Sequence, residues 1–167
     1  NFYNCGLIDA QLSILEKLDL SDLISLNLDK NRITQFELGT KLSSLVYVTF
    51  NDNPQLKQIR GGQTYAYLAR LEITRTAIER LLIPALPEIY YLDISQNEKL
   101  EEIRFAGSCP HLQVAFLRGN RLEKFHLPQG FEALVYLYLN NNQISDLKLH
   151  GTFPQLRTLQ LRDNELR

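Results

Sequence analysis

Apolar residues recur along the chain in a short pattern of about 22 residues. The first clear copy places Leu23, Leu26 and Leu28 ahead of Asn31 and Ile33. The Leu-x-Leu part alternates apolar and polar positions, which is typical of a half-buried β-strand. Six more copies follow, with these residues in the position of Asn31: Asn53, Thr76, Asn97, Asn120, Asn142 and Asn164. The pattern therefore predicts one short strand in each of seven repeats.

The spacing between these Asn positions varies only slightly, in steps of 22, 23, 21, 23, 22 and 22 residues. Both 23-residue steps contain one extra residue directly after Asn53 or Asn97. The 21-residue step is shortened around 83–87, just ahead of the next strand. Because the changes in length fall in turns, we expect the strands to keep a common register.

Each repeat has a second half with its own apolar pair, such as Phe36 and Leu38 or Phe125 and Leu127. This half is short and contains Gly and Pro, so we expect extended segments and short turns in it. The N-terminal part is less regular. Cys5 falls in the Asn position of a partial repeat, and residues 12–23 are predicted to form an irregular or partly helical loop.

The motif Leu-x-x-Leu-x-Leu-x-x-Asn-x-Leu resembles that of leucine-rich repeat proteins, and the resemblance covers nearly the whole chain. It implies an α/β horseshoe-type leucine-rich repeat solenoid. A parallel β-sheet would form the concave face, with mostly extended segments and short turns on the convex face. Residues 1–167 would be a single solenoid domain with about seven complete strand motifs and a partial N-terminal repeat. Since the sequence shows no end caps, we expect a fragment of a longer chain.

Stacking is what would hold such a chain together. One repeat cannot bury its own apolar face, so each repeat relies on its neighbours. The Asn side chain is expected to point inward and to bond backbone groups that the turn leaves unpaired. The polar positions between the leucines would then face outward on the concave side, where repeat folds generally bind their ligands.

Aromatic residues gather at these outward positions in three consecutive repeats. They should form one contiguous area, because neighbouring strands lie only about 4.8 Å apart. Aromatic residues and Arg are common anchors of protein interfaces. The predicted ligand-binding residues of the concave face are Tyr47, Tyr91, Asp93, Phe116, Arg118, Tyr136 and Tyr138. The alternative is that these large side chains simply cover the sheet.

Acidic residues give the first half of the same face a negative tendency, but basic residues are interleaved with them. This pattern favours a solvated surface of mixed charge. The acidic residues are Asp29, Asp52, Glu72 and Asp93, and the basic residues are Lys30, Arg70 and Arg75.

The sequence offers no candidate catalytic, cofactor-binding or metal-binding residues. His111, His126 and His150 fall on turns or on the convex half, and none has a Cys or His at metal-ligand spacing. The phosphate-binding and hydrolase motifs are also missing. We therefore expect a protein that is not an enzyme.

The net charge and the apolar runs bear on which partners the chain could have. With 18 basic and 19 acidic residues, the net charge of −1 argues against a nucleic-acid partner. No apolar run is long enough for membrane insertion of this segment.

Cys109 should be a buried small hydrophobe, on the order of 20 Å from Cys5 and so too far to pair with it. Cys5 would either be a free thiol or, as in secreted leucine-rich repeat proteins, bridge to a cysteine upstream.

The resemblance implies a recognition module that binds a protein, or alternatively a glycan, through its concave face. The variable repeat length and the start at Cys5 resemble secreted members, so an extracellular protein of the innate-immune or receptor type is expected. One alternative is a cytoplasmic scaffold or regulatory subunit, similar to phosphatase regulators with 22-residue repeats. Another is the recognition domain of a larger receptor or enzyme.

Overall fold

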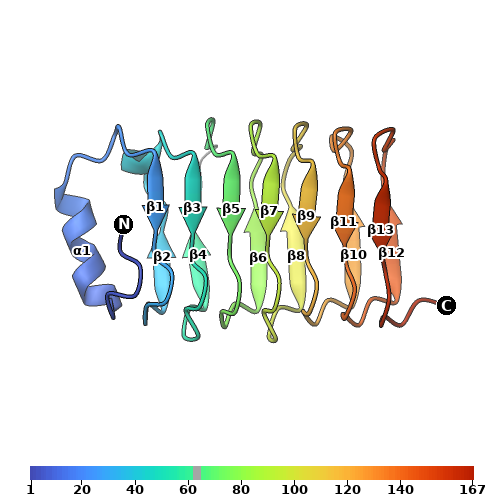
Figure 1. The fold of residues 1–167 in the computed structure, drawn as a ribbon, viewed down its shortest axis with the longest axis horizontal. Coiled ribbons are helices and arrows are strands. Elements are labelled where there is room, and N and C mark those ends of the chain that lie inside the picture. The colour runs from blue at the N-terminus through green and yellow to red at the C-terminus, as the bar shows by residue number, and fades with distance from the viewer. Residues whose placement is uncertain (62–64) are drawn as a thin grey trace.

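The computed structural model describes residues 1–61 and 65–167, and the chain winds through them as a parallel β-solenoid (Figure 1). Each turn adds one strand to a seven-stranded parallel sheet, and the strands lie side by side in chain order. These strands are β1 (Ser25–Asn27), β3 (Tyr47–Thr49), β5 (Arg70–Glu72), β7 (Tyr91–Asp93), β9 (Val114–Phe116), β11 (Tyr136–Tyr138) and β13 (Thr158–Gln160). We call the outward surface of this sheet the sheet face.

The register of the sheet is the one that the repeat predicts. Tyr47 pairs with Arg70, and Arg70 pairs in turn with Tyr91, so equivalent positions form straight rows across the strands. The middle residue of each strand points into the solenoid and is buried from β1 to β11. In the last strand, β13, the middle residue Leu159 is 38% exposed. The predicted alternation of inward and outward positions is confirmed.

The second half of each repeat is extended, as predicted. Its strands are β2 (Gln35–Glu37), β4 (Gln58–Arg60), β6 (Arg80–Ile83), β8 (Glu102–Phe105), β10 (Lys124–Leu127) and β12 (Asp146–Leu149). They pair as three two-stranded parallel sheets, whose outward surface we call the second face. Gln35 is in register with Gln58 although the turn after Asn53 is one residue longer than the turn after Asn31. The turn therefore absorbs the extra residue.

The α/β class that the resemblance implied is not supported. Within the described residues, helix is confined to α1 (Asp9–Lys17) and the 3-10 turn η1 (Thr40–Leu42). Each coil carries a second short strand instead, so extended backbone takes the place of helix on the second face. None of the helices in the described part of the chain is long and apolar enough to cross a membrane.

The N-terminal segment continues the solenoid by one partial coil. The backbone N–H of Phe2 donates to the carbonyl oxygen of Asn27, and that of Asn4 donates to the carbonyl oxygen of Asp29, both at 2.9 Å. Helix α1 then lies beside β1 and β2 at this end of the solenoid (Figure 1), and its Leu15 is buried against the core. The irregular, partly helical segment predicted over residues 12–23 is thus largely accounted for by α1 and the loop that follows it.

A column of buried side chains joins each turn to the next, and Asn97 shows how it works. Its Nδ2 donates to the carbonyl oxygens of Ile73 and Ile94, in two successive turns, at 2.8 and 3.2 Å. Its Oδ1 accepts from the backbone N–H and the hydroxyl of Thr76, at 2.9 and 2.7 Å. Asn31, Asn120, Asn142 and Asn164 make equivalent bonds. The predicted role of the Asn position is confirmed at these residues, and Asn53 donates in the same way although its Oδ1 has no partner in the described part of the chain. We call this set of side chains the asparagine column.

Leu137 provides a test of the inward register. It is 1% exposed at the middle of β11, so Leu137→Ala should lower the free energy of unfolding by ~2–5 kcal/mol, measured by urea denaturation. Leu82 on the second face is 62% exposed and is the matched control. Leu82→Ala should change stability by less than ~0.5 kcal/mol. Equal effects of the two substitutions would contradict the register.

Asn97 provides a test of the asparagine column. Asn97→Ala should destabilise the protein by ~3 kcal/mol or more in the same assay, because it leaves several buried backbone groups unpaired. Asn97→Asp should also destabilise it, because a carboxylate cannot donate to the carbonyl oxygens of Ile73 and Ile94. Asn140→Ala is the control, since among the described residues the Nδ2 of Asn140 makes one long bond of 3.4 Å, to Asn141. A loss as large for Asn140→Ala would count against the column.

Candidate functional site

The register of the sheet brings four predicted aromatic side chains into one continuous group. Phe116 and Tyr138 are register partners, and their rings stack at a centroid distance of 4.7 Å with an interplanar angle of 14°. The ring of Tyr91 lies 5.8 Å from that of Phe116, and the ring of Tyr136 lies 6.4 Å from that of Tyr138. We call these four residues the aromatic row. Their contiguity on the sheet face is as predicted.

Two arginines flank the aromatic row. The guanidinium carbon of Arg70 lies 4.1 Å from the centroid of the Tyr91 ring, and that of Arg118 lies 5.6 Å from the centroid of the Phe116 ring. Both distances are within the range of cation–π attraction. Burial and the nearby carboxylate of Asp93 raise the pKa of Tyr91, so its phenol stays neutral at physiological pH. The row is therefore an uncharged apolar surface with a cation near each flank.

The remaining two predicted residues, Tyr47 and Asp93, lie outside the aromatic row. Tyr47 is 42% exposed, and Arg70 on β5 separates it from Tyr91, so it stands apart from the aromatic row. Asp93 is in register with Phe116, and its Oδ1 accepts the backbone N–H of Ser95 at 3.0 Å. Asp93 thus borders the aromatic row, whereas Tyr47 belongs to the other half of the sheet face.

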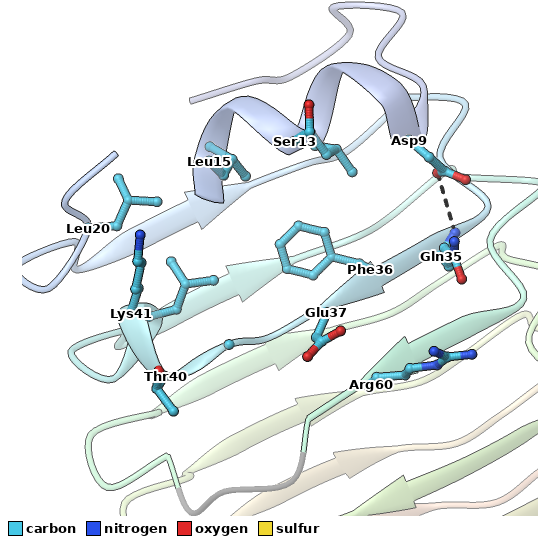
Figure 2. A pocket seen from close by; sticks show the side chains of 13 residues that line it. Asp9, Ser13, Leu15, Leu20, Gln35, Phe36, Glu37, Thr40, Lys41 and Arg60 are labelled. Atoms are coloured by element: carbon cyan, nitrogen blue, oxygen red, sulfur yellow. Dashed lines mark hydrogen bonds between the residues drawn. The ribbon is translucent and has the colours of Figure 1, made fainter. Parts of the chain in front are cut away.

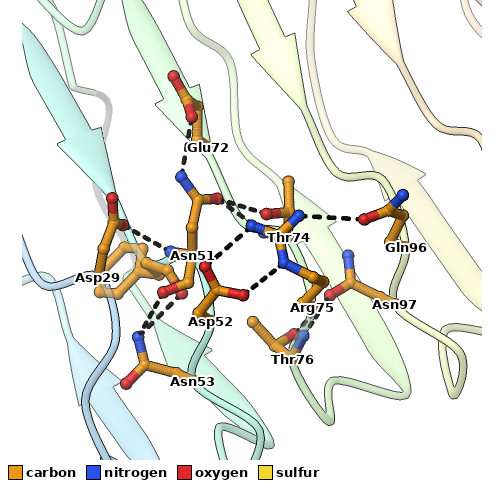
Figure 3. A network of polar contacts seen from close by, with 11 residues as sticks. Asp29, Asn51, Asp52, Asn53, Glu72, Thr74, Arg75, Thr76, Gln96 and Asn97 are labelled. Atoms are coloured by element: carbon orange, nitrogen blue, oxygen red, sulfur yellow. Dashed lines mark hydrogen bonds and ion pairs between the residues drawn. The ribbon is translucent and has the colours of Figure 1, made fainter. Parts of the chain in front are cut away.

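The acidic half of the sheet face is an ordered network (Figure 3) rather than a set of independent solvated charges. Asn51 lies at its centre: its backbone N–H donates to Asp29 at 2.7 Å, and its Nδ2 donates to Glu72 at 2.8 Å. Its Oδ1 accepts from the backbone N–H and the hydroxyl of Thr74. Glu72 also binds the Nε of Arg70 at 2.6 Å. Asp29 and Glu72 are therefore already paired within the protein.

A second pairing lies beside this network, at the turns that follow the strands. Arg75 forms a two-point ion pair with Asp52, through its Nε and through Nη2 at 2.9 Å, and its Nη1 donates to Gln96 at 3.0 Å. The hydrogen bond from Arg75 holds the pKa of Asp52 below its ordinary value. The sequence placed these residues in one row but could not show which charges would pair.

The residue before each Asn position has a left-handed backbone, which the sequence analysis did not foresee. Its φ angle is 55° in Lys30, 53° in Arg75 and 60° in Gln96. This conformation costs roughly 1–2 kcal/mol for a residue with a Cβ. Gly119, Asn141, Asp52 and Asp163 at the equivalent positions are of types that tolerate it better, and they were the available signal. The turn recurs because the asparagine column fixes the backbone on both sides of it.

A pocket of about 370 Å³ lies between α1 and β2, away from the sheet face (Figure 2). Leu12, Leu15 and Phe36 are among its apolar lining residues, and Glu37 and Arg60 are among its charged ones. Asp9 at its margin bonds the hydroxyl and the backbone N–H of Thr34. The pocket could not be foreseen, because the sequence did not fix the register of residues 12–23.

The cysteines and histidines lie outside the candidate site. Cys109 is 1% exposed, as predicted for a buried small hydrophobe, and burial raises the pKa of its thiol to about 11. Cys5 is exposed, and both cysteines are free. His126 contacts Asp146 at 3.0 Å on the second face. Over residues 1–61 and 65–167, we find no cluster of three or more His, Cys, Asp or Glu residues that could hold a metal ion.

No protein-family model matches this chain, and no curated protein matches it. What the structure establishes is a repeat architecture, a parallel β-solenoid of about six turns with ~22-residue spacing.

The pairing of Arg75 with Asp52 predicts how stability changes with pH. The lowered pKa of Asp52 means that the ion pair stabilises the fold above the ordinary Asp pKa of 3.8 and that this stabilisation is lost as the pH falls through the lowered value. Arg75→Gln should therefore reduce the free energy of unfolding at pH 7, by less than ~1 kcal/mol because the pair is partly exposed. In urea denaturation, the difference from the unsubstituted protein should shrink as the pH falls below 3.8 and vanish once Asp52 is protonated in the folded state. A difference that persists there would mean that Arg75 acts through packing instead.

Proposed function

We propose that this chain is a non-enzymatic recognition module that binds a protein partner through the sheet face. The supporting observation is the aromatic row, four ring side chains in contact on one side of a rigid sheet. Rigid aromatic side chains lose little conformational entropy on binding, and together with Arg they supply much of the energy of protein interfaces. Tyr136, 36% exposed at the end of the row, would be the principal anchor.

A protein fits the aromatic row better than a glycan does. Sugars bind aromatic residues by stacking a pyranose on an open ring face. Phe116 and Tyr138 stack on each other, so the two ring faces inside that stack are not open to a sugar. The rings together form a broad apolar surface, which suits the apolar side chains of a protein partner.

We infer that the repeat is of the leucine-rich type and that the sheet face is the concave side of its solenoid. The repeated motif with its buried leucines and asparagine column supports this inference. We further propose an extracellular protein of the innate-immune or receptor type. The exposed thiol of Cys5 is accessible for a disulfide with another cysteine, as secreted members would require. A free Cys5 in the natural protein would favour the cytoplasmic scaffold instead.

Site-specific photo-cross-linking tests the proposed function. A benzophenone amino acid would replace Val114, a neighbour of Tyr91 and Tyr136 in the same row of the sheet face. The matched control carries the same group at Leu82 on the second face. We expect a discrete cross-linked protein from position 114, in extracellular fluid of the source organism, and none from position 82.

The same partner then tests the binding residues. Phe116→Ala and Tyr136→Ala should each weaken its binding by ~2 kcal/mol or more, about 30-fold in Kd, while the thermal unfolding temperature of Tyr136→Ala stays near that of the unsubstituted protein. Titration calorimetry would measure the change. Unchanged affinity in both variants would remove the sheet face as the binding site.

A further inference from the structure

The sheet face has two halves that differ in how far their charged groups are already paired. From β1 to β5, the carboxylates of Asp29, Asp52 and Glu72 bond Asn51, Arg75 and Arg70. These groups would contribute little to the binding of a partner, because the free energy lost by breaking their internal bonds would offset the free energy gained from new ones. From β9 to β13, the face holds most of the aromatic row together with Arg118.

Arg118 differs from the other arginines of the sheet face. Glu72 pairs with Arg70, Asp52 with Arg75, and Asp163 with Arg162 at 3.2 Å. Arg118 is exposed, and within the described part of the chain its guanidinium forms no ion pair. Its guanidinium carbon lies 5.6 Å from the centroid of the Phe116 ring. All of its N–H donors therefore remain available to an anion.

Unpartnered polar atoms lie on both sides of Arg118. Ser95 and Asn140 occupy the equivalent position in the turns before and after it, because Asp93, Phe116 and Tyr138 are in register. Ser95 is 4% exposed, and its Oγ has no hydrogen-bond partner among residues 1–61 and 65–167. The same is true of the buried Oδ1 of Asn140. Buried polar groups are usually paired, and within the described residues unpartnered ones also occur at Thr49 and Asn53 in the other half of the solenoid. Of the two atoms beside Arg118, the Ser95 hydroxyl can donate to an anion, whereas the Oδ1 of Asn140 can only accept.

We propose that Arg118 is the receptor for a carboxylate on the partner protein, carried next to an aromatic side chain that packs on Phe116 and Tyr138. This inference rests on the proposed function and adds the chemistry of the partner. The planar guanidinium can bind a carboxylate through two parallel hydrogen bonds. The nearest carboxylate in register is Asp93, which the backbone N–H of Ser95 holds on the β7 side of Arg118.

Three small probes that share a phenyl ring but differ in charge test the proposal. They are 3-phenylpropionate, its neutral amide 3-phenylpropanamide, and the cation phenethylammonium. Each probe would be titrated into ¹⁵N-labelled protein. NMR would follow the chemical shifts of the backbone N–H groups of Phe116 and Gly119 and of the side-chain Nε–H of Arg118. We expect the carboxylate to bind about tenfold more tightly than the amide, as a charge-assisted bond requires, and the cation to bind most weakly. The preference should shrink as NaCl is added.

Arg118→Gln is the decisive variant. In it the carboxylate and the amide should bind with equal affinity, while shifts at Tyr138 persist because the rings remain. Arg75→Gln is the matched control: it also removes one arginine from the sheet face, but one that Asp52 already occupies. The preference for the carboxylate should survive in Arg75→Gln. Circular dichroism would establish that both variants are folded.

Each outcome separates this inference from the proposed function. Equal binding of carboxylate and amide to the unsubstituted protein, or a preference that survives Arg118→Gln, would overturn the anion receptor. If all three probes nevertheless shift Phe116 and Tyr138, the aromatic row remains a binding surface. Probes that leave the sheet face unshifted would also overturn the receptor, whereas the proposed function would still be decided by the cross-linking at position 114.

Discussion

The structure depends on a single repeated interaction, the bonding of one buried side-chain amide to the backbone of two successive turns. Asn97 bonds the carbonyl oxygens of Ile73 and Ile94 and accepts from Thr76, so it ties its own turn of the solenoid to the preceding one. Without these side chains the turns would bury unpaired backbone groups; at Thr76, which has no amide, the amide of the next turn bonds the Ile73 carbonyl oxygen instead. The column therefore sets the distance between turns and keeps every strand in the same register.

That register determines which side chains become neighbours on the sheet face. Because equivalent positions lie in straight rows, residues about 22 positions apart in sequence become neighbours about 4.8 Å apart. Phe116 and Tyr138 can stack for this reason, and Asn51 can reach Glu72 for the same reason. The same arrangement requires a left-handed backbone at Arg75, which is energetically unfavourable for a residue with a Cβ. The hydrogen bonds on either side of the turn offset this unfavourable energy.

The repeat made much of this predictable. Period and alternation were enough to place the strands, the inward leucines, the burial of Cys109 and the contiguity of the aromatic row, since all of these follow from register. The pairings of Arg75 with Asp52 and of Asn51 with Glu72 depend on side-chain rotamers, which a period does not specify. The pocket beside α1 lies where the repeat pattern breaks down, so no register was available there. The α/β class was wrong because it came from resemblance and not from the residues of the second halves.

The same geometry separates stability from recognition along each strand. In β11, Leu137 points into the core, whereas Tyr136 and Tyr138 on either side of it stand on the sheet face. A change at an outward position can alter a ligand contact without opening a cavity, and a change at Leu137 does the reverse. The network from β1 to β5 uses the outward positions for internal bonds, whereas no carboxylate of the described residues pairs with Arg118. A partner of the proposed kind would therefore gain most from the strands from β9 onward.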